Sequence, residues 1–184
     1  MNKIHNHTDE SLMSFVQQGS SSALEELYKR YSKPLLVLIY RMLNGNEIAA
    51  QDLLHQVFLK IMEKPKKFDT TKKFKPWLFA VAANECRKSF RQATTENLSE
   101  VADWANADSQ TARYEQREFY HQLEIALNKL NYEMREVFVL KHQQQLSIKE
   151  IATVLEIPEG TVKSRLHYAL KTLATQLNEF NPKK

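Results

Sequence analysis

The chain has 184 residues, of which 42% are hydrophobic, so it can bury the core of one domain or of two small ones. Only three glycines and five prolines interrupt a sequence rich in good helix formers, and no stretch alternates convincingly like a strand, so we expect an all-α protein. A formal charge of +4 permits an anionic partner. The single cysteine, Cys86, excludes an internal disulfide and a multi-cysteine zinc site.

The first two helices are predicted from their caps. Thr8 is placed to cap a helix of about ten residues, behind a polar tail with His5 and His7 that we expect to be disordered. Ser22, with Glu25 three residues on, has the pattern of a capping box and predicts the start of the second helix. Pro34 lies inside the apolar series of that helix and is expected to bend or break it.

Two more helices follow before the composition changes. Asn46 is expected to cap the third helix, which Pro65 closes. A lysine-rich loop at residues 66–75 leads to Pro76, which predicts the first turn of a fourth helix that ends near Gln92. Residues 92–112 then contain four acidic residues and no basic one, which indicates an acidic linker.

The sequence after this linker predicts a helix-turn-helix. Ser147 and Glu150 form a capping box ahead of a short helix, and a longer amphipathic helix begins after Pro158. Glu156 occupies the turn position where glycine commonly adopts a left-handed conformation. Such a motif lays the start of its second helix in the major groove of DNA. The candidate DNA-binding side chains off the apolar stripe are Thr161, Lys163, Ser164, Arg165, His167 and Tyr168. The alternative for Lys163 and Arg165 alone is a solvated helix face.

A second basic segment lies in the N-terminal half. Residues 60–91 carry ten lysines and arginines against three acidic residues, with aromatic residues between them. Cations that follow phosphates, beside rings that stack on exposed bases, are typical of single-stranded DNA binding. The alternative is that the rings form the core, which we favour for Trp77 and leave open for Phe68 and Phe79.

The helix-turn-helix also resembles a known family. Residues 146–152 and 157–166, with Arg135-Glu136-Val137-Phe138 before them, resemble region 4 of extracytoplasmic-function sigma factors. This resemblance implies that the module binds the −35 promoter element through the six residues named above and docks on the flap of the polymerase β subunit.

The N-terminal half resembles region 2 of the same family. Residues 52–61 look like the region 2.2 helix, which binds the clamp helices of the polymerase β′ subunit, and residues 74–84 look like regions 2.3 and 2.4, which recognise and melt the −10 element. The core-polymerase contacts implied by position are Asp52, Leu53, Gln56, Phe58 and Leu59. The −10 contacts implied by position are Phe68, Phe79, Asn84, Lys88 and Arg91, with the loop around Phe68 as the pocket for a flipped-out base.

The expected organisation is therefore two small helical modules, residues 1–92 and 113–184, joined by an acidic linker at 93–112. The resemblance implies a cytoplasmic sigma factor whose partners are core RNA polymerase, promoter DNA and an anti-sigma factor. We expect no small-molecule substrate, catalytic residue, metal or cofactor, because the sequence has no glycine-rich phosphate loop and its six histidines are scattered.

Two other functions fit the sequence. The chain is a homodimeric helix-turn-helix regulator if it binds palindromic duplex DNA without polymerase. It is a polymerase adaptor if it binds core polymerase without selecting start sites.

Overall fold

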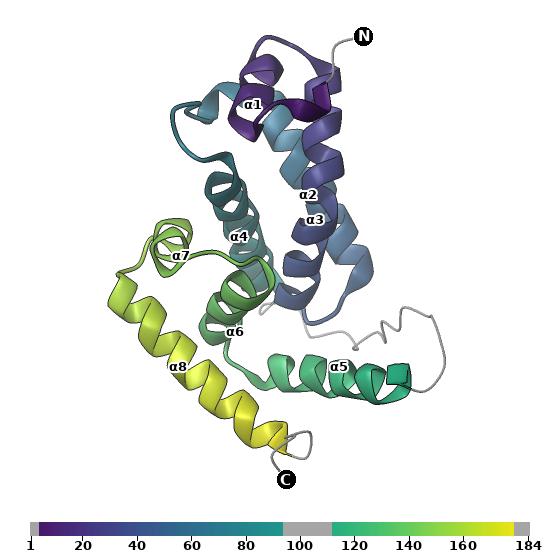
Figure 1. Cartoon of the computed structure of the whole chain (residues 1–184), viewed down its shortest axis with the longest axis vertical. Helices are drawn as coiled ribbons and strands as arrows, with labels where there is room; N and C mark the ends of the chain where they lie inside the picture. Colours follow the sequence, from purple (N-terminus) through teal and green to yellow (C-terminus); the bar gives the residue numbers. More distant parts are fainter. Residues whose placement is uncertain (1–3, 94–111, 179–184) are drawn as a thin grey trace.

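The structure is a computed structural model that describes residues 4–93 and 112–178 (Figure 1). We call these two ranges the N-terminal module and the C-terminal module. The elements of the N-terminal module are η1 (Ile4–Asn6), α1 (Asp9–Gln17), α2 (Ser21–Met42), α3 (Glu47–Glu63), η2 (Pro65–Lys67) and α4 (Phe74–Ala93). Those of the C-terminal module are α5 (Ala112–Lys129), α6 (Tyr132–Phe138), η3 (Val139–Gln143), α7 (Ile148–Leu155) and α8 (Glu159–Gln176). The described residues contain no strand, and the all-α prediction is confirmed.

The N-terminal module is a helical bundle in which α2 packs against both α1 and α3 while α4 closes the remaining side. The buried positions of α2 recur at helical spacing and include Leu27, Leu35 and Leu38, none of which is exposed. Burying each such leucine stabilises the fold by about 1.5–3 kcal/mol relative to leaving it in water. The bundle therefore fixes α3 and α4, which carry the expected contacts of this module.

The predicted N-cap of α2 is wrong, and the break expected at Pro34 does not occur. The N-cap is Ser20 and not Ser22, because the Ser20 hydroxyl accepts the Ala23 N–H at 3.3 Å. The helix also runs unbroken through Pro34. A proline removes one backbone hydrogen bond, whereas Tyr31 and Leu35 on either side are buried, so packing holds the helix together.

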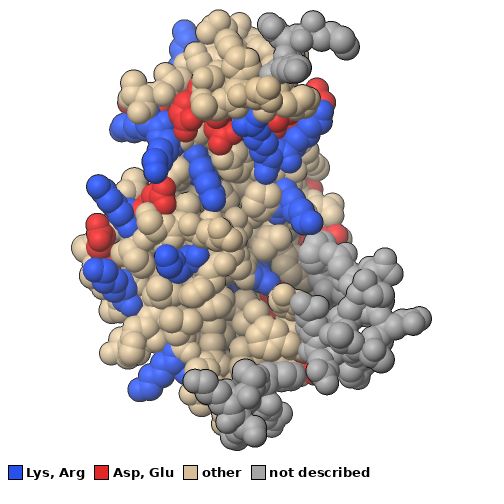
Figure 2. All heavy atoms as spheres, viewed as in Figure 1, with Lys and Arg blue, Asp and Glu red and all other residues tan. Residues whose placement is uncertain are grey.

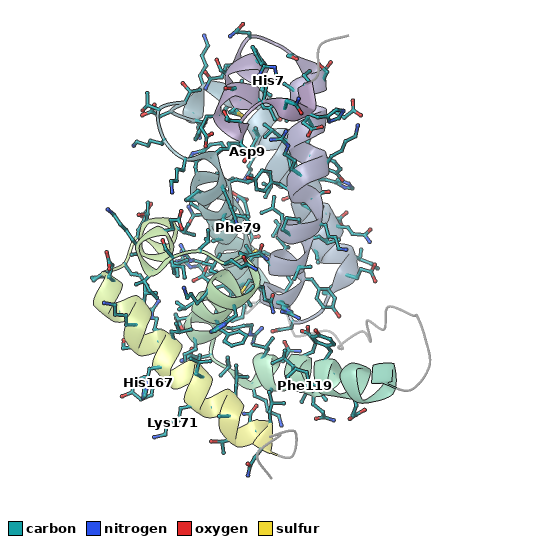
Figure 3. All side chains as sticks on the ribbon, viewed as in Figure 1. His7, Asp9, Phe79, Phe119, His167 and Lys171 are labelled. Carbon is teal, nitrogen blue, oxygen red and sulfur yellow. The ribbon has the colours of Figure 1, made fainter. Side chains whose placement is uncertain are left out.

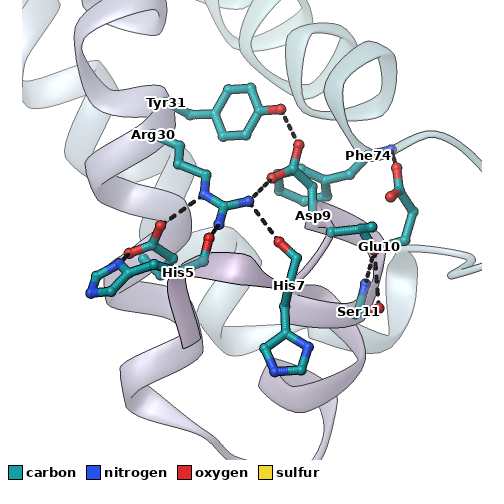
Figure 4. A network of polar contacts seen from close by, with 10 residues as sticks. His5, His7, Asp9, Glu10, Ser11, Arg30, Tyr31 and Phe74 are labelled. Atoms are coloured by element: carbon teal, nitrogen blue, oxygen red, sulfur yellow. Dashed lines mark hydrogen bonds and ion pairs between the residues drawn. The ribbon is translucent and has the colours of Figure 1, made fainter. Parts of the chain in front are cut away.

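Residues 4–8, which precede α1, are ordered, contrary to the disorder expected around His5 and His7. Their anchor is the Arg30 guanidinium on α2, which donates to the His5 carbonyl at 2.8 Å and to the His7 carbonyl at 3.0 Å (Figure 4). The same guanidinium pairs with Asp9 at 2.8 Å, and the Tyr31 hydroxyl also donates to Asp9. The predicted Thr8 cap is confirmed, since its hydroxyl accepts the Ser11 N–H.

The two modules are in contact. Helix α7 packs on α4, and α6 lies between α4 and α8 (Figure 1). Polar contacts cross the boundary at Arg87–Glu136 and Arg41–Glu124, and the Lys75 ammonium donates to the Gln144 carbonyl at 2.8 Å. We call this surface the module interface.

Arg135 of α6 lies at the module interface, 5% exposed. Its guanidinium donates to the Arg41 carbonyl at 3.1 Å and to the Asn44 side chain, both at the end of α2. It also donates to the Asn128 and Leu130 carbonyls at the end of α5, at 3.0 and 3.2 Å. Carbonyls at a helix C-terminus have no partner within their own helix, so one side chain satisfies the ends of two helices.

The helix-turn-helix forms as predicted. The capping box of Ser147 and Glu150 opens α7, and Glu156 ends it in the left-handed conformation with φ 56° and ψ 42°. The carbonyl of Pro158 then accepts the N–H groups of Thr161 and Val162 in the first turn of α8. The turn fixes the angle at which α8 leaves α7.

The Glu156 backbone predicts the effect of a substitution. A residue with a β-carbon pays a steric cost of about 1 kcal/mol in this conformation. We therefore expect Glu156→Gly to raise the midpoint of thermal unfolding by a few degrees. As a control, Glu159→Gly introduces glycine at a right-handed helical position and should lower the midpoint. A lower midpoint in Glu156→Gly would contradict the steric cost assigned to the left-handed conformation of Glu156.

Candidate polymerase and nucleic-acid interface

Helix α8 presents most of its expected DNA-binding residues to solvent. Lys163, Ser164, His167 and Tyr168 are exposed, and Figure 3 shows His167 pointing away from the rest of the molecule. Thr161 is half-buried, and its carbonyl accepts the Ser164 hydroxyl at 3.0 Å. The exposed residues offer a cation, hydroxyl and imidazole groups and an aromatic ring, which suit phosphate and base-edge contacts.

Arg165 differs from its neighbours on α8. It is half-buried and lies close enough to Glu136 of α6 to lower the pKa of that carboxyl. Glu136 is 2% exposed and pairs with Arg87 of α4 at 3.1 Å. The same carboxylate therefore faces cations from both of the helices expected to contact DNA.

Burial sets the protonation of Glu136. It raises the pKa of the carboxyl to about 7 from an ordinary 4.5, although Arg87 and Arg165 lower it and Glu133 adds to the rise. Between these two pH values the folded protein binds more protons than the unfolded chain. The free energy of unfolding must therefore fall as the pH rises through this window.

This linkage predicts a measurable pH dependence. Glu136 is expected to lower the free energy of unfolding by up to about 1.4 kcal/mol per pH unit between pH 5 and 7. Urea titrations at several pH values give the free energy of unfolding at each pH. This free energy should depend less steeply on pH in Glu136→Gln, whose side chain stays neutral throughout. An identical pH dependence of the unfolding free energy in the two proteins would show that burial does not raise the pKa of Glu136.

The C-terminal half of α4 carries three of the residues expected to bind the −10 element. Asn84, Lys88 and Arg91 are exposed, and with Arg87 and Gln92 they line a hollow of about 330 Å³. The Arg87 guanidinium donates to the Asn84 side-chain oxygen at 2.9 Å. Arg87 was not predicted as a site residue, although its spacing of three residues from Asn84 places both on one face of the helix.

The structure does not support base stacking by Phe68 or Phe79. Phe68 is 2% exposed and packs against Phe74 and Trp77, with ring centroids 5.4 and 5.0 Å away. Phe79 is 0% exposed and lies three helical turns before Phe90, so both rings share one face of α4; Phe90 contacts Tyr132 of α6 with ring centroids 4.7 Å apart. In this arrangement the rings of Phe68 and Phe79 belong to the core and neither offers a free face to a base.

Lysines and not aromatic rings form the outer surface of the loop at residues 64–73. The exposed ones are Lys64, Lys66, Lys67, Lys72 and Lys73. Lysine and arginine side chains outnumber acidic ones over the face of the molecule in Figure 2. This loop and α4 together make a basic surface suited to a phosphate backbone.

Helix α3 divides the expected polymerase contacts into two sets. Asp52, Gln56 and Leu59 are exposed, whereas Leu53 and Phe58 are each 7% exposed and pack in the core. The last two are therefore corrected to core residues, because both side chains are buried. Phe58 packs against Tyr28 of α2, with ring centroids 4.8 Å apart.

Two exposed apolar residues on α3 were missed. Ile48 is 77% and Met62 54% exposed. With Asp52, His55 and Leu59 they recur every three or four residues, so all five share one face of the helix. We call this face the α3 stripe. The spacing was visible in the sequence, and three of the five residues, Ile48, Leu59 and Met62, are exposed apolar side chains.

Within residues 4–93 and 112–178, no three His, Cys, Asp or Glu side chains are grouped so that they would hold a metal ion. Cys86 is fully buried, and burial raises the pKa of its thiol far above the usual range. No helix in the described part of the chain has the length and apolar character needed to cross a membrane.

Comparison with known proteins identifies both modules. The family model of sigma-70 region 2 matches residues 27–96, and that of sigma-70 region 4 matches residues 120–173. The chain is 31% identical over 179 residues to the ECF RNA polymerase sigma factor SigW of Bacillus subtilis, covering 89% of this chain and 94% of that protein. The chain belongs to the extracytoplasmic-function sigma factors. This RNA polymerase sigma factor is also 32% identical over 164 residues to SigL of Mycobacterium tuberculosis, covering 88% and 92% of the two chains.

Solved structures share the fold of this sigma factor. CnrH in complex with the cytosolic domain of CnrY has a TM-score of 0.72 at 22% identity, covering 94% of this chain and 99% of that one. RpoE from Bartonella quintana, in complex with the anti-sigma factor NepR, has a TM-score of 0.67 at 22% identity, covering 84% and 98%. Both modules match sigma-70 family models and the relatives are sigma factors, so the homodimeric operator-binding alternative is not favoured.

Proposed function

We propose that this sigma factor brings core RNA polymerase to promoters by reading two DNA elements with two separate helices. Helix α8 reads the −35 element, and α4 with the lysine-bearing loop holds and opens the −10 element. The observation that carries this proposal is that each family-matched module has one helix with an exposed basic face, Lys163 on α8 and Lys88 with Arg91 on α4.

Neither face suffices alone. Each offers few cations, and their attraction for DNA weakens as salt screens it. A partner that holds both modules at a fixed separation makes the two contacts act together. We assign that role to core polymerase, with the α3 stripe on the β′ clamp helices and the C-terminal module on the β flap. This function places the protein in the cytoplasm and asks no catalysis of it.

An anti-sigma factor is the proposed regulator. Two proteins of the same fold were solved with CnrY and with the anti-sigma factor NepR. Since the three chains share their arrangement of helices, we propose that a protein of this class holds this sigma factor inactive.

The direct test mixes the purified protein with core polymerase and a library of linear promoters. Transcripts that start at specific sites only when both proteins are present support the proposal. Core binding without specific start sites would reduce the protein to a polymerase adaptor, and tight binding to palindromic duplex without polymerase would make it an operator-binding regulator.

The α3 stripe makes its own prediction. Asp52→Ala is expected to weaken binding to core polymerase several-fold, because an exposed carboxylate at the centre of the stripe is lost. Affinity can be measured by fluorescence anisotropy of labelled protein. The control is Glu25→Ala, which removes an exposed carboxylate from α2 of the same module. Equal affinities for the two variants would reject this role for Asp52.

A further inference from the structure

Helix α1 lies before the part of the chain that the region 2 family model matches, which begins at residue 27. It is nevertheless built into the N-terminal module, because Leu12 and Met13 are fully buried and α1 contacts α2, α4 and η2. The polar side chains of α1 show what it holds in place.

Gln17, the last residue of α1, is hydrogen-bonded to the start of the lysine-bearing loop, residues 64–73. Its side-chain amide donates to the Pro65 carbonyl at 3.1 Å and to the Phe68 carbonyl at 2.8 Å. These two carbonyls stand at either end of the η2 turn, so one amide group bridges the turn. Hydrophobic residues in place of Gln17 would leave both carbonyls without this donor.

Glu10, near the start of α1, grips the other end of the loop. Its carboxylate accepts the Phe74 N–H at 2.9 Å, which is the first residue of α4. A negative charge there also suits the N-terminal end of the helix dipole. Between the two grips, the Asp69 carboxylate accepts the Thr71 N–H at 3.0 Å and orders the tip of the loop.

Helix α1, which carries Gln17 and Glu10, is itself held in place by ion pairs. Arg30 pairs with Asp9 and with Glu26, both at 2.8 Å, and thereby joins the first turn of α1 to α2 (Figure 4). Inside the loop, Phe68 and Phe74 pack edge to face, so the loop is anchored by its rings and presents its lysines outwards. An ordered loop loses less conformational entropy when it binds a strand than a loose one does.

We infer that α1 positions the lysine-bearing loop for the opened DNA strand, and that Gln17 and Glu10 are positioning residues for promoter opening. This inference rests on the proposed function and adds the segment before residue 27 to the machinery of opening. Neither residue touches DNA in this account; each acts through the backbone of residues 64–74.

The test uses full-length protein with core polymerase and two versions of one promoter, a closed duplex and the same sequence opened by mismatches across the −10 element. Gln17→Leu should lower transcription from the duplex about ten-fold, and from the opened template by much less, with unchanged affinity for core polymerase. Glu10→Leu removes the acceptor of the Phe74 N–H and should show the same duplex-specific loss of transcription as Gln17→Leu.

Ser20→Ala is the matched control for stability. It removes the cap of α2 three residues from Gln17 but leaves the loop contacts in place. Its stability loss should affect both templates alike. Hydrogen exchange at residues 64–74 should accelerate in Gln17→Leu and not in Ser20→Ala.

The outcomes separate the inference from the proposed function. Faster exchange together with a duplex-specific defect supports the inference. A defect of Gln17→Leu that is equal on both templates, or full activity despite faster exchange, overturns it while the proposed function stands. Absence of core-dependent transcripts from the wild-type protein on either template overturns both.

Discussion

Promoter-directed transcription is expected to fall at least about ten-fold when Lys163 and Arg165 are both replaced by alanine, with no change in affinity for core polymerase. The loss of one good base contact costs about 1–3 kcal/mol, and ten-fold corresponds to about 1.4 kcal/mol. Lys163 contributes through its exposed ammonium near the start of α8. Arg165 contributes less directly, because it is half-buried beside Glu136.

Single variants separate these two contributions. Lys163→Ala should account for most of the loss and should also make DNA binding less dependent on salt, since each phosphate contact adds about 0.9 to the salt slope. The control is Lys171→Ala, which removes the same charge two turns further along α8 (Figure 3). Equal transcription by Lys163→Ala and Lys171→Ala would reject α8 as the helix that enters the groove.

Arg135→Met is expected to lower the free energy of unfolding by about 3 kcal/mol or more, the largest stability loss we anticipate for one substitution. Methionine fills a similar volume but has no donor for the Arg41, Asn128 and Leu130 carbonyls. Each buried acceptor left without a partner costs about 1–3 kcal/mol, and part of this is regained by removing a buried charge.

Urea unfolding followed by circular dichroism measures this loss as a shift of the midpoint at constant slope. Arg135→Lys keeps the charge but cannot reach both helix ends with one nitrogen. Its urea midpoint should therefore lie between those of Arg135→Met and the wild type. Lys129→Met, at the end of α5, is the control for a lost surface charge. An Arg135→Met midpoint equal to that of the control would show that water satisfies these carbonyls.

Features fixed by neighbouring residues were predictable from the sequence. The capping box of Ser147 and Glu150 and the left-handed Glu156 follow from local chemistry and appear as expected. The exposed basic faces of α8 and α4 follow from helical spacing alone. Pro34 was mispredicted because its local tendency to break a helix is overridden by packing from the rest of the bundle.

Features fixed by distant residues were not predictable in this way. Arg87 is linked to Glu136, 49 positions later in the chain, and nothing near Arg87 announces that partner. The burial of Phe79 depends on how α4 packs within the fold, where it contacts α1, α2, α3 and α7, and Phe68 is covered by its packing on Phe74 and Trp77. The sequence pattern of an aromatic residue in a basic segment is the same whether its ring is exposed or buried.

The module interface sets a condition on promoter binding. The centres of a −35 and a −10 element lie about 25 base pairs apart, or about 85 Å along the duplex at roughly 3.4 Å per pair. A compact chain of this length has a radius of gyration of only about 16 Å. A molecule that occupies both elements must therefore give up the Arg87–Glu136 and Arg41–Glu124 pairs and uncover the face of α4 that carries Phe79. By thermodynamic reciprocity, whatever strengthens the interface weakens simultaneous occupancy by the same factor, so the closed form is a built-in competitor of the promoter.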